Sequence, residues 1–188
     1  MEDKHKEKQL AMENLLEVKE ALDFLKVDFV LDGGTLLGAY RDNDFCEDDH
    51  DDIDLTTLHD SSIAIDIVEA LSEKGFELYH YWEKGEKNTA QLSMKRHGLK
   101  IDLMFKEVKR KNAWWTVFQG KKLIYKRVPA KYYNKTELIS FQRNEFNIPK
   151  ETEDYLELRY GDWKTPIHRR EFSCYTSDKV IVENYEKI

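Results

Sequence analysis

The sequence predicts one α+β domain of 188 residues, and three observations carry that prediction. Two segments, 6–26 and 61–74, repeat apolar residues near the helical period, whereas 76–82, 89–96 and 99–105 alternate as half-buried strands do. At this length one hydrophobic core is expected instead of two. The composition, 40% hydrophobic and 36% charged, is typical of an ordered globular protein.

The N-terminal part of the chain is expected to form a helix, a strand and a second, shorter helix. The apolar stripe of 6–26 suits a packing helix, and Val27–Leu31 is a short apolar strand. Gly33 and Gly34 then turn the chain into a helical segment, Thr35–Arg41. Glycines at such a turn let backbone N–H groups approach a phosphate oxygen closely.

The middle of the chain continues with a helix and a hairpin. The helix at 61–74 is expected to end at Gly75, because glycine is favoured at a helix C-terminus. Strands 89–96 and 99–105 are joined tightly at His97-Gly98, as in a β-hairpin.

The C-terminal part is expected to contain a short helix over 151–160, which Gly161 ends. Asp162 and Trp163 follow in the turn and are interpreted as mainly structural, with Arg159 or Asp162 as candidates to reach a site. The tail from residue 169 onward has some β-like alternation and no recognisable chemistry.

Two carboxylates, Asp52 and Asp54, are the first candidate metal ligands. They flank Ile53 at the start of a predicted strand, so their side chains point to the same face. Adjacent carboxylates repel one another unless a cation lies between them, and hard oxygen ligands suit Mg²⁺ or Mn²⁺. The alternative is an acidic surface loop without a ligand.

Asp102 is the third candidate, because it stands between apolar neighbours in strand 99–105. An isolated buried charge would cost several kcal/mol, so Asp102 needs a cation, an arginine or a cap. We interpret it as a third metal ligand, or as the base that accepts the proton of an attacking hydroxyl. A salt bridge to a core arginine, or an outward position on an edge strand, is the alternative.

The residues before the acidic pair are candidates for binding a phosphate-containing substrate. Gly33, Gly34 and Thr35 could form a phosphate loop, or a plain strand-to-helix turn with Thr35 as the helix cap. Arg41 could pair bidentately with a phosphate, or neutralise the acidic residues that follow it.

Charge is distributed unevenly along the chain. Eight acids lie between Asp42 and Asp54, more than one metal site uses, so most of them are interpreted as a solvated loop, with His50 and Asp51 ambiguous. Segment 106–135 instead contains ten Lys or Arg interleaved with aromatic residues. It is either a cationic wall for an anionic acceptor or a nucleotide base, or a hairpin turning at Gln119-Gly120 with its aromatic residues in the core.

Several classes of function are disfavoured. The net charge of -7 argues against a stable nucleic-acid complex. Cys46 and Cys174 lie far apart, and neither they nor the histidines have zinc-ligand spacing, so reduced thiols and no zinc are expected. The sequence has no signal-peptide core and no run of about 18 apolar residues, so we expect a cytoplasmic protein without a transmembrane segment.

Two sequence blocks resemble the LicD family, within the superfamily that also contains polymerase-β-like nucleotidyltransferases. The first is G-G-T-L-L-G-A-Y-R over 33–41, followed about ten residues later by D-D-I-D-L over 51–55. The second is F-Q-R-N-E-F-N-I-P over 141–149, followed by Y-L-E-L-R-Y-G-D-W over 155–163. The family usually has a proline and a tryptophan before its acidic run. Residues 47–51 of this chain differ from that pattern, so the donor substrate of the family is not assigned to this chain.

The resemblance implies a nucleotidyltransferase-like mixed sheet flanked by helices, with Asp52, Asp54 and Asp102 holding the metal. It divides the single domain into an N-terminal helix (1–26), a catalytic core (27–105), a β-rich and helical C-terminal part (106–166) and a tail (167–188).

The resemblance also implies a Mg²⁺-dependent or Mn²⁺-dependent transferase that moves a phospho-linked group, such as phosphocholine or a polyol phosphate. The donor would be nucleotide-linked, of the CDP type, and the acceptor a hydroxyl of a sugar or glycan. One alternative is transfer of a nucleotide from a nucleoside triphosphate to a small molecule or protein. Another is a non-catalytic module that binds a nucleotide or phosphosugar.

Overall fold

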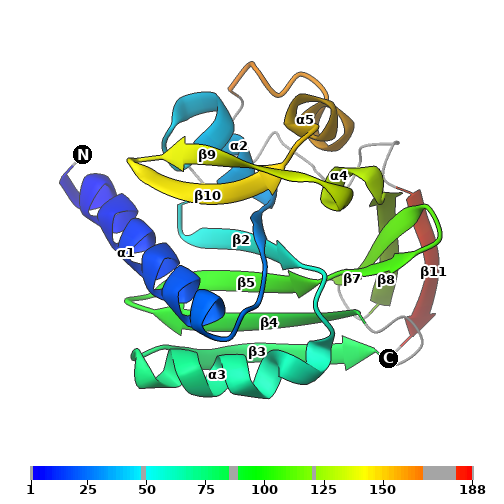
Figure 1. Cartoon of the computed structure of the whole chain (residues 1–188), viewed down its shortest axis with the longest axis horizontal. Helices are drawn as coiled ribbons and strands as arrows, with labels where there is room; N and C mark the ends of the chain where they lie inside the picture. The colour runs from blue at the N-terminus through cyan, green and yellow to red at the C-terminus, as the bar shows by residue number, and fades with distance from the viewer. Residues whose placement is uncertain (1, 48–49, 85–88, 120–121, 167–180, 188) are drawn as a thin grey trace.

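The computed structural model describes residues 2–47, 50–84, 89–119, 122–166 and 181–187, and it confirms the α+β class (Figure 1). The helices are α1 (Glu2–Phe24), α2 (Gly33–Asp42), α3 (Ala64–Glu73), α4 (Lys131–Asn134) and α5 (Thr152–Tyr160), and a 3-10 turn, η1 (Ser61–Ile63), precedes α3. The strands are β1 (Val30–Leu31), β2 (Asp52–Thr57), β3 (Glu77–Lys84), β4 (Thr89–Arg96), β5 (Leu99–Phe105), β6 (Glu107–Lys109), β7 (Asn112–Gln119), β8 (Lys122–Pro129), β9 (Thr136–Phe141), β10 (Asn144–Pro149) and β11 (Ile181–Lys187).

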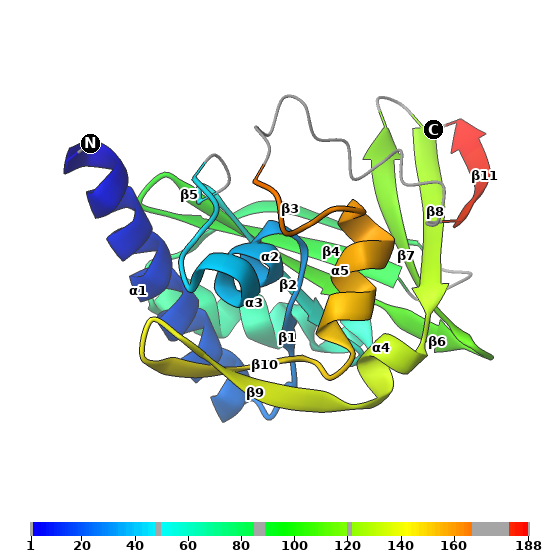
Figure 2. The ribbon, with the colours of Figure 1, turned by 90° about the horizontal axis from the view of Figure 1, so that it is seen from above.

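The central sheet is mixed, as the family resemblance implied. Its strand order is β1-β2-β5-β4-β3. Strands β2 and β5 run parallel, whereas the other neighbours pair antiparallel. A β9–β10 ribbon and a four-stranded sheet, β11-β8-β7-β6, complete the β-structure. Figure 2 shows the four-stranded sheet at one end of the molecule, with α1 at the other end.

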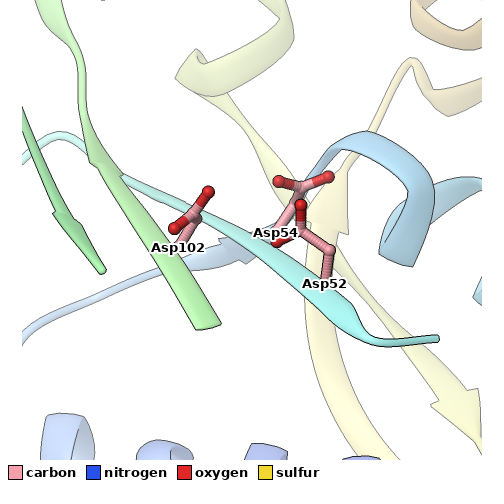
Figure 3. A group of neighbouring side chains, drawn as sticks. All are labelled: Asp52, Asp54 and Asp102. Carbon is pink, nitrogen blue, oxygen red and sulfur yellow. The ribbon is translucent and has the colours of Figure 1, made fainter. Parts of the chain in front are cut away.

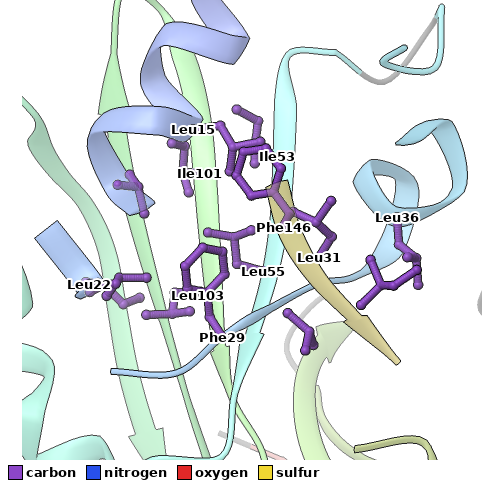
Figure 4. Packing of buried hydrophobic residues seen from close by; sticks show 14 of the residues in the cluster. Leu15, Leu22, Phe29, Leu31, Leu36, Ile53, Leu55, Ile101, Leu103 and Phe146 are labelled. Carbon is purple, nitrogen blue, oxygen red and sulfur yellow. The ribbon is translucent and has the colours of Figure 1, made fainter. Parts of the chain in front are cut away.

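The core lies between α1 and one face of the central sheet (Figure 4). Ile53 and Leu55 of β2 point to this face and are fully buried. Because side chains alternate along a strand, the residues next to them face the opposite side of the sheet. The apolar side chains that meet at this face include Leu15, Leu22, Ile53, Leu55, Ile101 and Leu103.

The predicted turns at His97-Gly98 and Gly75 are found where the sequence placed them. Strands β4 and β5 have the predicted bounds, and His97 and Gly98 between them both have positive φ, 57° and 81°. This is the backbone of the type I′ hairpin turn. Gly75, with φ 83°, follows α3 as expected. The first predicted strand is shorter than expected, since only Val30 and Leu31 pair with β2.

The basic, aromatic segment 106–135 is largely a hairpin. Strands β7 and β8 pair antiparallel, with Gln119 opposite Lys122. Buried aromatic residues among its described side chains include Trp114, Trp115, Tyr125, Tyr132 and Tyr133. The hairpin interpretation accounts for Trp114, Trp115 and Tyr125, whereas Tyr132 and Tyr133 lie on α4. The acceptor-wall interpretation stays a prediction.

The β-like alternation of the tail corresponds to β11, which pairs antiparallel with β8. This part of the tail is therefore a strand of the second sheet and not a separate extension. Residues 167–180, with Cys174 among them, lie outside the described residues.

No helix within the described ranges is both long enough and apolar enough to cross a lipid bilayer.

Ile53→Ala is expected to lower the free energy of unfolding by about 2–5 kcal/mol, because it leaves a cavity under the central sheet. The matched control is Ile65→Ala on α3, where the side chain is 71% exposed. That control is expected to change stability by about 0.5 kcal/mol or less. Urea denaturation measures both, and equal losses in the two variants would contradict the placement of Ile53 in the core.

Candidate metal centre and its surroundings

The parallel pairing of β2 with β5 brings the three predicted carboxylates together. In its register Asp54 lies directly opposite Asp102, and Asp52 lies opposite Lys100. One ligand oxygen from each of Asp52, Asp54 and Asp102 lies within 4.8 Å of the others. Figure 3 shows the three side chains on the same side of the two strands.

Asp102 is the most buried of the three, with 5% of its surface exposed. Its Oδ1 atom is buried and has no hydrogen-bond partner within the described part of the chain. A buried carboxylate oxygen without a donor is costly in free energy, so this position favours a bound ligand.

Sequence reasoning missed Lys100, which lies on the same face of β5 as Asp102. Its Nζ is 2.8 Å from Asp102 Oδ2 and 3.0 Å from Asp52 Oδ2. Burial lowers the pKa of Lys100, but its hydrogen bond to Asp102 and the charges of Asp102 and Asp52 outweigh burial and raise the pKa above its ordinary value. The signal was present in the sequence, because residues two apart on a strand share a face.

Gly33 and Gly34 lie against Asp54. The Gly34 N–H donates to Asp54 Oδ2 at 3.1 Å. Gly33 has φ +53°, and a Cβ on it would overlap the Asp54 carboxylate. Glycine is therefore required here for both conformation and space. The N-terminus of α2 also favours the negative charge of Asp54.

Thr35 is buried and links α2 to β2, because its Oγ1 accepts a hydrogen bond from the Asp54 N–H at 2.9 Å. The helix cap is Asp32 and not Thr35, since the Asp32 side chain accepts from the Gly33 N–H. Phosphate binding by Gly33, Gly34 and Thr35 stays a prediction.

Asp32 is a second feature that sequence reasoning missed, and it is the centre of a buried polar network. Burial alone would raise its pKa, but the charges of Lys106 and Arg159 outweigh that effect and hold the pKa well below the ordinary range. Burial lowers the pKa of Lys106 to about 8, although Asp32 opposes this shift. The donors to Asp32 are the Gly33 N–H and the side chains of Thr56, Lys106, Tyr133, Tyr155 and Arg159.

This network connects the C-terminal helix α5 to the diglycine turn. Arg159 on α5 contacts Asp32 Oδ1 at 3.5 Å, and Tyr155 donates to the same oxygen at 2.7 Å. Arg159 therefore reaches the neighbourhood of the candidate site. Asp162 does not act there in the same way, because it accepts a hydrogen bond from Thr165 in an exposed turn.

Arg41 forms an ion pair with Asp42 at 2.7 Å and donates to the Trp163 carbonyl. This agrees with the interpretation that Arg41 neutralises acids after it, and phosphate pairing stays a prediction. His50, which was ambiguous, is buried and pairs with Glu7 of α1 at 2.8 Å.

The donor set fits a hard divalent cation. All three candidate ligands are carboxylates, one oxygen of each lies within 4.8 Å of the others, and Asp102 offers a buried oxygen with no donor among the described residues. Residues Asp52, Asp54 and Asp102 would hold Mg²⁺ or Mn²⁺ at this position.

Gly33→Ala is expected to destabilise the protein more than Gly75→Ala. Both positions have positive φ, so both variants carry the strain of a left-handed residue, about 1–2 kcal/mol. An added methyl group at Gly75 meets no atom within 4 Å, whereas at Gly33 it meets Asp54. Gly33→Ala is therefore expected to lower the free energy of unfolding by about 1 kcal/mol or more beyond the loss in Gly75→Ala. Urea denaturation measures both losses. Equal losses would show that the turn does not lie against Asp54.

Asp32→Asn is expected to lower the free energy of unfolding by about 3–5 kcal/mol at neutral pH, because it leaves Lys106 and Arg159 buried without their carboxylate partner. The folded-state pKa of Asp32 is lowered, so its stabilisation is present above the unfolded pKa of about 4 and is lost as pH falls below it. The stability gap between wild type and variant is therefore expected to shrink between pH 6 and pH 3. Urea denaturation across this range tests it, with the exposed Asp66→Asn as control; a constant gap would contradict the network.

Comparison with known proteins gives a family and several structural likenesses. The family described as LicD/FKTN/FKRP, nucleotidyltransferase domain, matches residues 26–151, which is more than half of the chain. No curated protein matches the chain. Among solved structures, the antibiotic-resistance factor ANT(2'')-Ia is similar with a TM-score of 0.43 and 15% identity, over 56% of this chain and 52% of that chain. The matched segment contains Gly33, both β2 aspartates and Asp102, and the chain belongs to the LicD/FKTN/FKRP family of nucleotidyltransferase domains.

Proposed function

We propose that the protein is a metal-dependent transferase, which moves a phospho-linked group from a nucleotide diphosphate donor to a hydroxyl of a sugar or glycan. Membership of the family supports transfer of a phospho group. The observation that carries the proposal is the convergence of Asp52, Asp54 and Asp102 from two parallel strands onto one spot beside the diglycine turn.

Each carboxylate has a role in this proposal. Asp52 and Asp54 would hold the cation, together with one oxygen of Asp102. When bound, the cation supplies the positive charge that stabilises the phosphate oxygens in the transition state. The second oxygen of Asp102 would accept the proton of the acceptor hydroxyl.

At phosphorus, the reaction forms one bond and breaks one bond. The acceptor oxygen attacks the phosphorus that carries the head group, and a new P–O bond forms. The bond from this phosphorus to the bridging oxygen breaks, and the nucleoside monophosphate leaves. The N-terminal end of α2 lies beside Asp54, where its positive end favours phosphate.

A direct test is incubation of the protein with Mg²⁺, mixed sugar and glycan acceptors, and radiolabelled CDP-choline, CDP-ribitol or nucleoside triphosphates. We expect CMP and a labelled acceptor from one of the CDP donors. The double variant Asp52→Asn, Asp54→Asn is expected to lose about 100-fold or more of the rate, because it removes charge from the cation site. Asp66→Asn, a change of the same chemistry at an exposed position on α3, is expected to retain activity.

The other outcomes discriminate between functions. Pyrophosphate release from a nucleoside triphosphate would replace the proposal with nucleotide transfer. Metal-dependent nucleotide binding in calorimetry, with no turnover of any donor, would replace it with a binding module. Equal activity in the double variant and wild type would contradict the assignment of the site.

A further inference from the structure

Lys100 occupies the position between two of the candidate ligands. Its Nζ lies 3.0 Å from Asp52 Oδ2 and 2.8 Å from Asp102 Oδ2, so one ammonium group bridges carboxylates of two neighbouring strands. The β2–β5 register places Lys100 opposite Asp52, which fixes this arrangement in the backbone. An ammonium and a divalent cation would compete for these two oxygens.

Lys100 alone does not neutralise the charge of the three carboxylates. The three carboxylates carry −3 and Lys100 carries +1, so the ammonium neutralises only part of the charge of the cluster. Among the described residues, Asp102 Oδ1 has no donor, although Oδ2 is paired with Lys100. The ammonium therefore supplies only part of the positive charge and of the hydrogen-bond donors that these carboxylates need.

Lys100 and Asp52 are more exposed than Asp102. The Lys100 side chain is 26% exposed and the Asp52 side chain 21%, whereas that of Asp102 is 7% exposed. Lys100 can therefore leave toward solvent without disturbing the core under β2 and β5. Its long, flexible stem also keeps the displaced charge near the site.

We infer that Lys100 is a built-in counter-ion of the metal site, which holds Asp52 and Asp102 together in the apo protein and is displaced when a divalent cation binds. This rests on the proposed metal-dependent function. It adds that metal affinity is set by competition with an internal cation, and that metal binding releases an ammonium group beside the donor phosphates.

The test compares Mn²⁺ binding to wild type, Lys100→Met, Lys100→Arg and Lys109→Met by calorimetry, without nucleotide. Lys109 is an exposed strand lysine paired with Glu107, so Lys109→Met removes the same charge away from the site. We expect Lys100→Met to bind Mn²⁺ more tightly than wild type by about tenfold or more, because the competing charge is gone. Lys100→Arg and Lys109→Met are expected to bind like wild type.

Acetylation of the wild-type protein by an amine-reactive ester, followed by mass spectrometry, separates displacement from simple repulsion. We expect Mn²⁺ to accelerate modification of Lys100 and to leave modification of Lys109 unchanged. Faster labelling together with tighter binding by Lys100→Met supports the inference.

Two results would overturn the counter-ion role of Lys100, and only the second would also overturn the metal-dependent function. If wild type binds Mn²⁺ and Lys100→Met binds no more tightly, or if Mn²⁺ does not accelerate labelling of Lys100, the counter-ion role is wrong and the metal site stands. If neither wild type nor Lys100→Met binds Mn²⁺, the metal-dependent function is wrong as well.

Discussion

The parallel pairing of β2 with β5 is the constraint on which the rest of the structure depends. Its register sets Asp54 opposite Asp102 and Asp52 opposite Lys100, and it sends Ile53, the residue between the two β2 aspartates, to the core. A slip by one residue would exchange the two faces, burying the charges and exposing the apolar residues. The hydrophobic burial that stabilises the sheet therefore also fixes the positions of the charged side chains.

A second constraint keeps the diglycine turn in place beside these strands. Asp32 is buried directly before Gly33, and its carboxylate accepts hydrogen bonds from residues far away in sequence, including Lys106 and Tyr155. A network of this kind is costly unless all of its members are satisfied. It connects the C-terminal helix to the site, and this gives the second sequence block of the family a structural role beside the first.

The sequence was sufficient for the parts of the fold that depend on local pattern. Alternation and turn residues located β4, His97-Gly98 and β5, and the spacing of Asp52 and Asp54 placed both on one face. Long-range contacts were harder to predict. The role of Asp32 depends on side chains from four separate segments, and the short β1 depends on where β2 pairs with it. The alternation of side chains along a strand, which identified Asp52 and Asp54, could also have placed Lys100 on the same face as Asp102.

The central claim is that three carboxylates from two strands form one cation site. A crystal soaked in Mn²⁺ and measured at the manganese absorption edge tests it most directly. The account predicts one anomalous peak among Asp52, Asp54 and Asp102, at about 2.0–2.2 Å from their oxygens, with Lys100 moved away from Asp52. A difference map without any peak at this position, with Lys100 still bridging Asp52 and Asp102 at saturating Mn²⁺, would contradict it.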